Sequence, residues 1–147
     1  MYLFFKRVFD IATATIALIL LSPILIPSCI ISLFTGEREV FYKQKRMGFK
    51  NIPFDIWKFA TMLKNSPNIG TGEITLRNDP RVTSFGKLLR ITKVNELPQI
   101  INVFKGDMSI VGPRPPLPRE VALYSAYDFQ RLAVKPGLTC IWQVSGR

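Results

Sequence analysis

The distribution of apolar and polar residues divides the chain into a long apolar segment near the N-terminus and a more polar remainder. No charged residue occurs from Ile11 to Thr35, and a run of this length is sufficient for a transmembrane helix. In the remainder, residues 37–50 and 53–59 have the composition and alternation of strands. The pattern predicts an α+β fold with a membrane-inserted helix over residues 1–36. A domain of short helices and a small sheet is expected over residues 37–147.

Two features of the apolar segment argue against a simple membrane span. Ser22-Pro23 and Pro27 interrupt it near its middle, and neither half alone, at about 1.5 Å per residue, crosses a hydrocarbon core of about 30 Å. Basic residues also flank both ends, whereas a spanning helix normally has them in excess on one side. The pattern favours a re-entrant helix that bends at Ser22-Pro23 and returns to the same face of the membrane. A kinked span is the alternative, and a signal peptide is disfavoured by the long apolar continuation past Cys29.

Shorter elements are predicted in the rest of the chain. Residues 64–80 are rich in Asn, Gly, Pro and Thr and indicate a long loop. A short helix over 85–92 would be capped by Ser84. A further amphipathic helix is predicted over 119–132, followed by a final strand over 138–144.

The central stretch, Leu89 to Pro115, contains the residues best suited to chemistry. Asn95 is a good helix N-cap, Glu96 would lie in the first turn, and Gly106 suits the helix C-terminus. A buried face is predicted from the helical spacing of Leu97, Ile100, Ile101 and Phe104.

Residues 112–116, Gly-Pro-Arg-Pro-Pro, follow this helix and hold Arg114 in a stiff, extended turn. A helix N-terminus and a rigidly presented arginine are both suited to binding phosphate. The central stretch therefore predicts a site for a phosphorylated ligand.

Composition narrows the classes of function. The chain has 20 basic and 10 acidic residues, a formal net charge of +10, which favours anionic partners such as phosphoesters or acidic lipids. Because the chain has no histidine, imidazole catalysis is excluded and most zinc sites are disfavoured. Cys29 and Cys140 are too few and too far apart for a disulfide framework. Nucleic-acid binding is disfavoured because the chain has an apolar anchor and no recognition motif.

Several motifs occur in a fixed order that resembles a known family. They are Lys6-Arg7-Val8-Phe9-Asp10, Ser22-Pro23, Phe41-Tyr42-Lys43-Gln44, Lys58-Phe59, the central stretch, Pro136-Gly137-Leu138-Thr139 and Trp142-Gln143-Val144-Ser145-Gly146-Arg147. Together they resemble the bacterial sugar transferase family, the monotopic polyprenyl-phosphate phosphoglycosyl transferases. The resemblance covers nearly the whole chain.

The resemblance implies an enzyme on the cytoplasmic face of the bacterial inner membrane. Such enzymes transfer a sugar phosphate from a nucleotide diphosphate sugar, with uridine as the expected base, to undecaprenyl phosphate. This is the first membrane step in the assembly of surface glycans such as exopolysaccharide or lipopolysaccharide. Mg²⁺ is the implied cofactor, and a phospholipid membrane is an implied partner. Self-association into a homo-oligomer is left open.

The resemblance also implies roles for particular residues. It places Asn95 and Glu96 at the catalytic pair, with Glu96 as the metal ligand, and Lys58 and Arg90 at the substrate phosphates, which Arg114 would also bind. Asp107 is a further candidate for catalysis, and Lys6, Arg7, Ser22 and Pro23 are expected to contact the membrane.

The sequence departs from the family's pattern at the most important position. The family's Asp-Glu pair, in which the aspartate attacks phosphorus, falls on Asn95-Glu96, and a neutral amide cannot act as that nucleophile. Ala60 also replaces an arginine present in many members, and the family's C-terminal continuation is absent. Two hypotheses follow. In the first the chain is an active transferase in which Glu96, Asp107 or the lipid phosphate itself attacks. In the second it is a catalytically impaired relative that binds nucleotide sugar or lipid phosphate.

Overall fold

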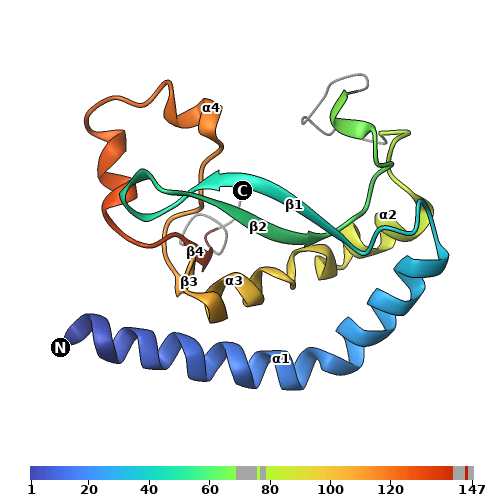
Figure 1. The fold of residues 1–147 in the computed structure, drawn as a ribbon, viewed down its shortest axis with the longest axis horizontal. Coiled ribbons are helices and arrows are strands. Elements are labelled where there is room, and N and C mark those ends of the chain that lie inside the picture. Colours follow the sequence, from blue (N-terminus) through green and yellow to red (C-terminus); the bar gives the residue numbers. More distant parts are fainter. Residues whose placement is uncertain (69–75, 77–78, 141–144, 146–147) are drawn as a thin grey trace. The chain divides into compact units, whose positions relative to one another are not determined.

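The computed structural model describes residues 1–68, 76, 79–140 and 145, and within these it confirms the predicted α+β fold (Figure 1). The strands are β1 (Phe41–Met47), β2 (Pro53–Phe59), β3 (Ser109–Val111) and β4 (Gly137–Thr139). The α-helices are α1 (Tyr2–Phe34), α2 (Ser84–Ile91), α3 (Gln99–Lys105) and α4 (Pro118–Val121). The 3-10 helices are η1 (Phe49–Asn51), η2 (Ser66–Asn68), η3 (Val94–Glu96) and η4 (Asp128–Ala133).

The contacts divide the chain into two compact units, which are described separately. The first unit comprises Met1–Leu20, Lys43–Trp57 and Gln99–Arg147. The second unit comprises Leu21–Tyr42 and Lys58–Pro98.

Helix α1 is the long apolar element that the hydropathy pattern predicts. It is helical over 33 residues, without interruption at Pro23 or Pro27. Within the described residues, Leu3–Phe34 is the one helix long and apolar enough to cross a membrane by length and composition. A change of direction at Ser22-Pro23 and a return to the same face of the membrane stay predictions.

Strands β1 and β2 form a two-stranded sheet joined by a short turn, in which the Gly48 amide donates to the Ile52 carbonyl at 2.9 Å. The bounds predicted for β2 are confirmed. The strand predicted over 37–50 is shorter than expected, because β1 begins at Phe41. In the second unit, the ring of Phe41 stacks on that of Phe59 with 5.5 Å between centroids.

Helix α2 begins one residue before the predicted helix, and its N-cap is not Ser84. Thr83 precedes the helix in an extended conformation, and its hydroxyl accepts a hydrogen bond from the Gly86 amide at 3.0 Å. Because this bond satisfies a free amide of the first turn, Thr83 is the cap and Ser84 is the first helical residue.

The start predicted for the helix between Asn95 and Gly106 is wrong. Lys93 has a left-handed backbone conformation with φ 63°, Asn95 lies inside the short turn η3, and α3 begins only at Gln99. Asn95 is therefore not the N-cap of α3. The predicted end is confirmed, because the helix stops at Lys105 and Gly106 follows with φ 98°.

The buried face predicted for this helix is also wrong in part. Ile100 is buried as expected, but Phe104 is 49% exposed and the polar Asn102 is completely buried. Asn102 is buried because β2 satisfies its amide. Its oxygen accepts from the Trp57 amide at 3.0 Å, and its nitrogen donates to the Asp55 carbonyl at 2.8 Å.

The helix predicted over 119–132 is two short elements, α4 and η4. The Asp128 carboxylate accepts hydrogen bonds from both the amide and the hydroxyl of Ser125, at 3.0 and 2.6 Å, which closes a turn between the two elements. Such a turn competes with a continuous helix. The final strand is β4, which pairs in parallel with β3, and residues 141–144 of the predicted strand lie outside the described residues.

Candidate functional site

The segment Gly112–Pro116, called here the Arg114 segment, is fixed by backbone hydrogen bonds within the first unit. The Gly112 amide donates to the Thr139 carbonyl at 3.1 Å. The Pro113 and Pro116 carbonyls accept from the amides of Gly137 and Met47, each at 2.9 Å. Arg114 is therefore presented from a backbone that is anchored on both sides.

Two glycines allow this arrangement because their backbones are in direct contact. A Cβ added to Gly112 would lie 2.5 Å from the Lys135 carbonyl oxygen, and one added to Gly137 would lie 2.0 Å from the Gly112 nitrogen. Any side chain at either position would have to displace backbone atoms, so the close approach requires glycine.

Arg46 supports the Arg114 segment from β1. Its side chain is buried, with Nη1 donating to the Pro115 carbonyl at 3.0 Å and Nη2 donating to the Gln44 side chain at 3.0 Å. In the sequence, Arg46 is one of the basic residues that follow the apolar segment. Hydrophobic periodicity gives no signal for its contact with the Arg114 segment, because Pro115 is 69 positions away.

A pocket of about 830 Å³ opens beside the Arg114 segment, also within the first unit. Besides that segment it is lined by Val111, Glu120, Tyr124, Arg131 and Cys140. Its volume lies within the range of about 300–1,000 Å³ that is usual for small-molecule sites.

The charges around this pocket favour an anion. Among the described residues, neither Arg114 nor Arg131 forms an ion pair. The carboxylate of Glu120, the one acid among the described residues that line the pocket, accepts a hydrogen bond from the Leu117 amide at 2.6 Å. Arg131 lies over the ring of Tyr124, with 6.0 Å between the guanidinium carbon and the ring centroid. Sequence reasoning missed Arg131, because only the fold brings it to Arg114.

The second unit contains Arg90, which was also predicted to bind phosphate. Its Nε donates to the Thr61 hydroxyl at 2.8 Å, and burial, together with the nearby Arg81, lowers its pKa. Arg81 itself is committed to structure, because it donates to both oxygens of Asp79, at 2.9 and 2.6 Å. The hydrogen bonds from Arg81 hold the pKa of Asp79 well below its usual range. Lys58, the remaining predicted phosphate ligand in this unit, is half-buried on β2.

Asn95 and Glu96, in the second unit, occupy the positions that correspond to the Asp-Glu pair of the family that the sequence resembles. The side-chain oxygen of Asn95 is buried and has no hydrogen-bond partner in the described structure. Glu96 is half-buried, and no hydrogen bond or ion pair of its side chain occurs among the described residues. A buried acceptor without a donor costs about 1–3 kcal/mol, so the Asn95 oxygen is a candidate for contact with an external ligand.

The chemistry of the two side chains is compatible with a magnesium ion that substrate phosphates complete. Mg²⁺ prefers oxygen ligands and is commonly held by one or two carboxylates together with substrate phosphates. Asn95 and Glu96 offer one amide oxygen and one carboxylate. Within residues 1–68, 76, 79–140 and 145, no cluster of three or more His, Cys, Asp or Glu side chains could hold a metal. A cation at Asn95 and Glu96 would therefore depend on the phosphates of the substrate.

Asp107, the third predicted catalytic residue, already has partners in the first unit. Its carboxylate accepts from the Asn102 side chain at 3.1 Å and lies 3.5 Å from the Lys105 ammonium. These contacts account for an acid at this position without a role in chemistry.

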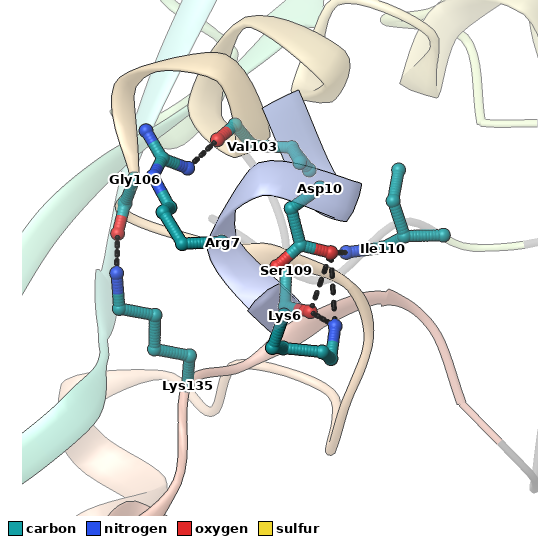
Figure 2. A network of polar contacts seen from close by, with 8 residues as sticks. All are labelled: Lys6, Arg7, Asp10, Val103, Gly106, Ser109, Ile110 and Lys135. Carbon is teal, nitrogen blue, oxygen red and sulfur yellow. Dashed lines mark hydrogen bonds and ion pairs between the residues drawn. The ribbon is translucent and has the colours of Figure 1, made fainter. Parts of the chain in front are cut away.

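The N-terminal part of α1 contributes a network of polar contacts to the first unit (Figure 2). Arg7 donates to the carbonyls of Val103 and Phe104, both at 2.7 Å, at the C-terminal end of α3. Lys6 donates to Asp10 at 2.9 Å and to the Ser109 hydroxyl. Both cations thus have protein partners, and their predicted contact with lipid headgroups stays a prediction.

The structure therefore distributes the predicted site residues between the two units. The first unit holds Lys6, Arg7, Asp107 and Arg114, and the second holds Ser22, Pro23, Lys58, Arg90, Asn95 and Glu96.

Comparisons with known proteins agree on one family. The family described as bacterial sugar transferase matches residues 1–147. The chain is 36% identical to the exopolysaccharide production protein ExoY of Rhizobium meliloti, over 97% of the chain and 69% of that protein. It is 37% identical to the undecaprenyl-phosphate galactose phosphotransferase of Salmonella typhimurium, over 98% of the chain and 33% of that protein. It is 35% identical to the undecaprenyl-phosphate glucose phosphotransferase of Komagataeibacter xylinus, over 96% of the chain and 28% of that protein.

Proposed function

Because the chain belongs to the bacterial sugar transferase family, we propose that it transfers a sugar phosphate from a nucleotide diphosphate sugar to undecaprenyl phosphate. Two relatives are named as undecaprenyl-phosphate phosphotransferases, one of galactose and one of glucose, which supports this proposal. The product would be an undecaprenyl diphosphate sugar, the first membrane-linked intermediate of a surface glycan. Uridine is the nucleoside that we expect in the donor.

The main observation in support of a donor site is the pocket beside the Arg114 segment. A nucleotide diphosphate sugar brings two phosphates, and the pocket has two guanidinium groups that form no ion pair in the described structure. Arginine binds phosphate oxygens through paired, charge-assisted hydrogen bonds. Because the Arg114 backbone is already fixed, little conformational entropy is lost when phosphate binds.

Asn95 decides which group attacks the donor. We propose that the lipid phosphate attacks directly, since the amide of Asn95 cannot form a phosphoenzyme. An oxygen of undecaprenyl phosphate forms a bond to the phosphorus that carries the sugar. The bond from this phosphorus to the bridging oxygen breaks, and the nucleoside monophosphate leaves with that oxygen and its electron pair.

The protein's own residues would hold and orient the reacting phosphates. Glu96 and Asn95 would bind Mg²⁺, which when present supplies positive charge to the phosphate oxygens. Arg114 would orient the donor, and Arg90 would add a fixed positive charge in the second unit. Direct transfer needs this orientation, because two negatively charged phosphates must approach each other.

Helix α1 fits a location at a membrane. Its side chains at Leu3, Phe4, Phe5 and Phe9 are between 58% and 79% exposed, a large apolar surface for a protein in water. We propose that this surface lies in the lipid of the inner membrane, with the catalytic units on the cytoplasmic face. Undecaprenyl phosphate would then reach the site from the same membrane.

A transfer assay in nanodiscs tests the proposal. The chain is mixed with undecaprenyl phosphate, Mg²⁺ and a panel of radiolabelled uridine diphosphate sugars, and lipid-linked label is measured after extraction. Label in the lipid fraction that requires Mg²⁺ and Arg114 supports the proposal. If donors bind but no sugar of the panel is transferred, the chain is instead the catalytically impaired relative suggested by Asn95.

A further inference from the structure

Asp10 is a buried carboxylate on a helix that is otherwise apolar over most of its length. Asp10 is 3% exposed. Burial of a charge costs free energy unless the charge is paired and hydrogen-bonded. One oxygen of Asp10 accepts from the Lys6 ammonium at 2.9 Å, the Ser109 hydroxyl at 3.0 Å and the Ile110 amide at 3.1 Å. Figure 2 shows these three donors converging on that oxygen.

Two of the three donors belong to β3, the strand that leads into the Arg114 segment. Ser109 and Ile110 come directly before Val111, after which the segment begins. β3 is also fixed by its pairing with β4. There the Ser109 amide donates to the carbonyl of Pro136, the residue before β4, at 2.8 Å. β3 spans only three residues, so a bond from outside the sheet is a large share of what fixes it.

The neighbouring cations of the network act at a different place. Arg7 binds the carbonyls at the end of α3, and Lys135 donates to the Gly106 carbonyl at 2.8 Å. These contacts tie down the C-terminal end of α3 and do not include an atom of β3. Within this network, the direct side-chain bonds from α1 to β3 are made by Asp10 and its partner Lys6.

We propose that Asp10 is a positioning residue for the donor site, which acts by fixing β3 and thereby Arg114. This role of Asp10 depends on the proposed function in one respect, which is the binding of the donor's phosphates by Arg114. The membrane-inserted helix would then set the position of the phosphate-binding arginine as well as anchor the protein. Lys6 neutralises the carboxylate and completes its contacts.

The first arm of the test is amide hydrogen exchange of the full chain in nanodiscs, without any ligand. Asp10→Asn should raise the exchange rate of the Ile110 and Gly112 amides by about tenfold. Lys135→Met is the matched control, because it removes the hydrogen bond of the same network that Lys135 donates to the Gly106 carbonyl, directly after α3. It should leave those two amides unchanged. Ser109→Ala keeps the Lys6–Asp10 pair and serves as a milder variant if Asp10→Asn does not fold.

The second arm is a double-mutant cycle on the dissociation constant for uridine diphosphate. Asp10→Asn should weaken binding by about tenfold in the native background and by less than about twofold in the Arg114→Ala background. A general loss of stability would weaken binding similarly in both backgrounds. Loss of the Asp10 effect when Arg114 is absent is therefore the signature of positioning.

The outcomes separate the two proposals. Faster exchange at β3 together with coupling to Arg114 supports the role of Asp10. Unchanged exchange in both Asp10→Asn and Ser109→Ala overturns it, as does equal weakening in both backgrounds. If Arg114→Ala alone leaves binding unchanged, the proposed donor site fails and Asp10 does not position it, whereas the exchange data still show whether Asp10 orders β3.

Discussion

The Arg114 segment of the first unit and the Asn95–Glu96 pair of the second unit both carry predicted site residues, but they differ in how completely the protein's own hydrogen bonds satisfy them. The backbone of the Arg114 segment is hydrogen-bonded to β1 and β4, and the buried Arg46 binds its Pro115 carbonyl. Asn95 has a buried oxygen without a partner. The backbone of the first region is held by the protein alone, and we expect a ligand to complete the second region. Changes that disturb the backbone of the first region should therefore reduce stability, whereas changes to the side chains that face a ligand should alter binding.

The largest effect is expected from Gly112→Ala. The new methyl group would meet the Lys135 carbonyl oxygen at 2.5 Å, so backbone must shift, at a cost of about 3 kcal/mol in the free energy of unfolding. Thermal unfolding in detergent measures the loss. Gly48→Ala is the matched control, because a Cβ there would lie 3.0 Å from the Phe54 ring and 3.2 Å from the Ile52 carbonyl oxygen, distances that shifts of a few tenths of an ångström relieve. Equal losses in the two variants would show that the Arg114 segment is not specially constrained.

A smaller effect, on binding rather than folding, is expected from Arg114→Ala. Hydrogen bonds to charged groups contribute about 1.5–3 kcal/mol, so the dissociation constant for a uridine diphosphate sugar should rise by about 10- to 100-fold. Calorimetric titration measures the change. Lys87→Ala removes an exposed cation from α2 and controls for net charge. If both variants weaken binding equally, general electrostatic attraction explains the affinity.

The smallest effect on stability is expected from Asn95→Ala in the absence of metal. The gain from removing a buried acceptor without a partner is offset by the packing lost with the side chain, so the free energy of unfolding should change by less than about 1 kcal/mol. With Mg²⁺ and uridine diphosphate present, the native chain should gain thermal stability and the variant should gain less. Glu96→Gln should show the same reduced response. An identical gain in all three chains would remove both residues from the metal site.

The sequence predicted the regular and local features well. The bounds of β2 and the end of α3 at Gly106 follow from alternation and from the conformational freedom of glycine. The stiff turn that carries Arg114 follows from its flanking prolines. These features depend on residues within a few positions of each other, which periodicity and turn chemistry describe.

The errors share a physical cause, since each depends on a contact that local sequence does not contain. Asn102 is buried because β2 satisfies its amide, and Asn95 is not a cap because Lys93 turns the chain before α3 begins. The roles of Arg46 and Arg131 depend on β1 and η4 being brought to the Arg114 segment. Asp10 offered one local signal, an acid four residues after Lys6 on a helix, but its bonds to β3 could not be predicted from it.

The proposal of direct attack is tested most directly by omitting the acceptor. The native chain and its Asn95→Asp variant are each incubated with Mg²⁺ and a uridine diphosphate sugar labelled in the phosphate that carries the sugar, without undecaprenyl phosphate. The account predicts that the native chain releases no uridine monophosphate and carries no label until lipid phosphate is added, whereas Asn95→Asp becomes labelled at once. Stoichiometric label on the native chain before the lipid is added would contradict it.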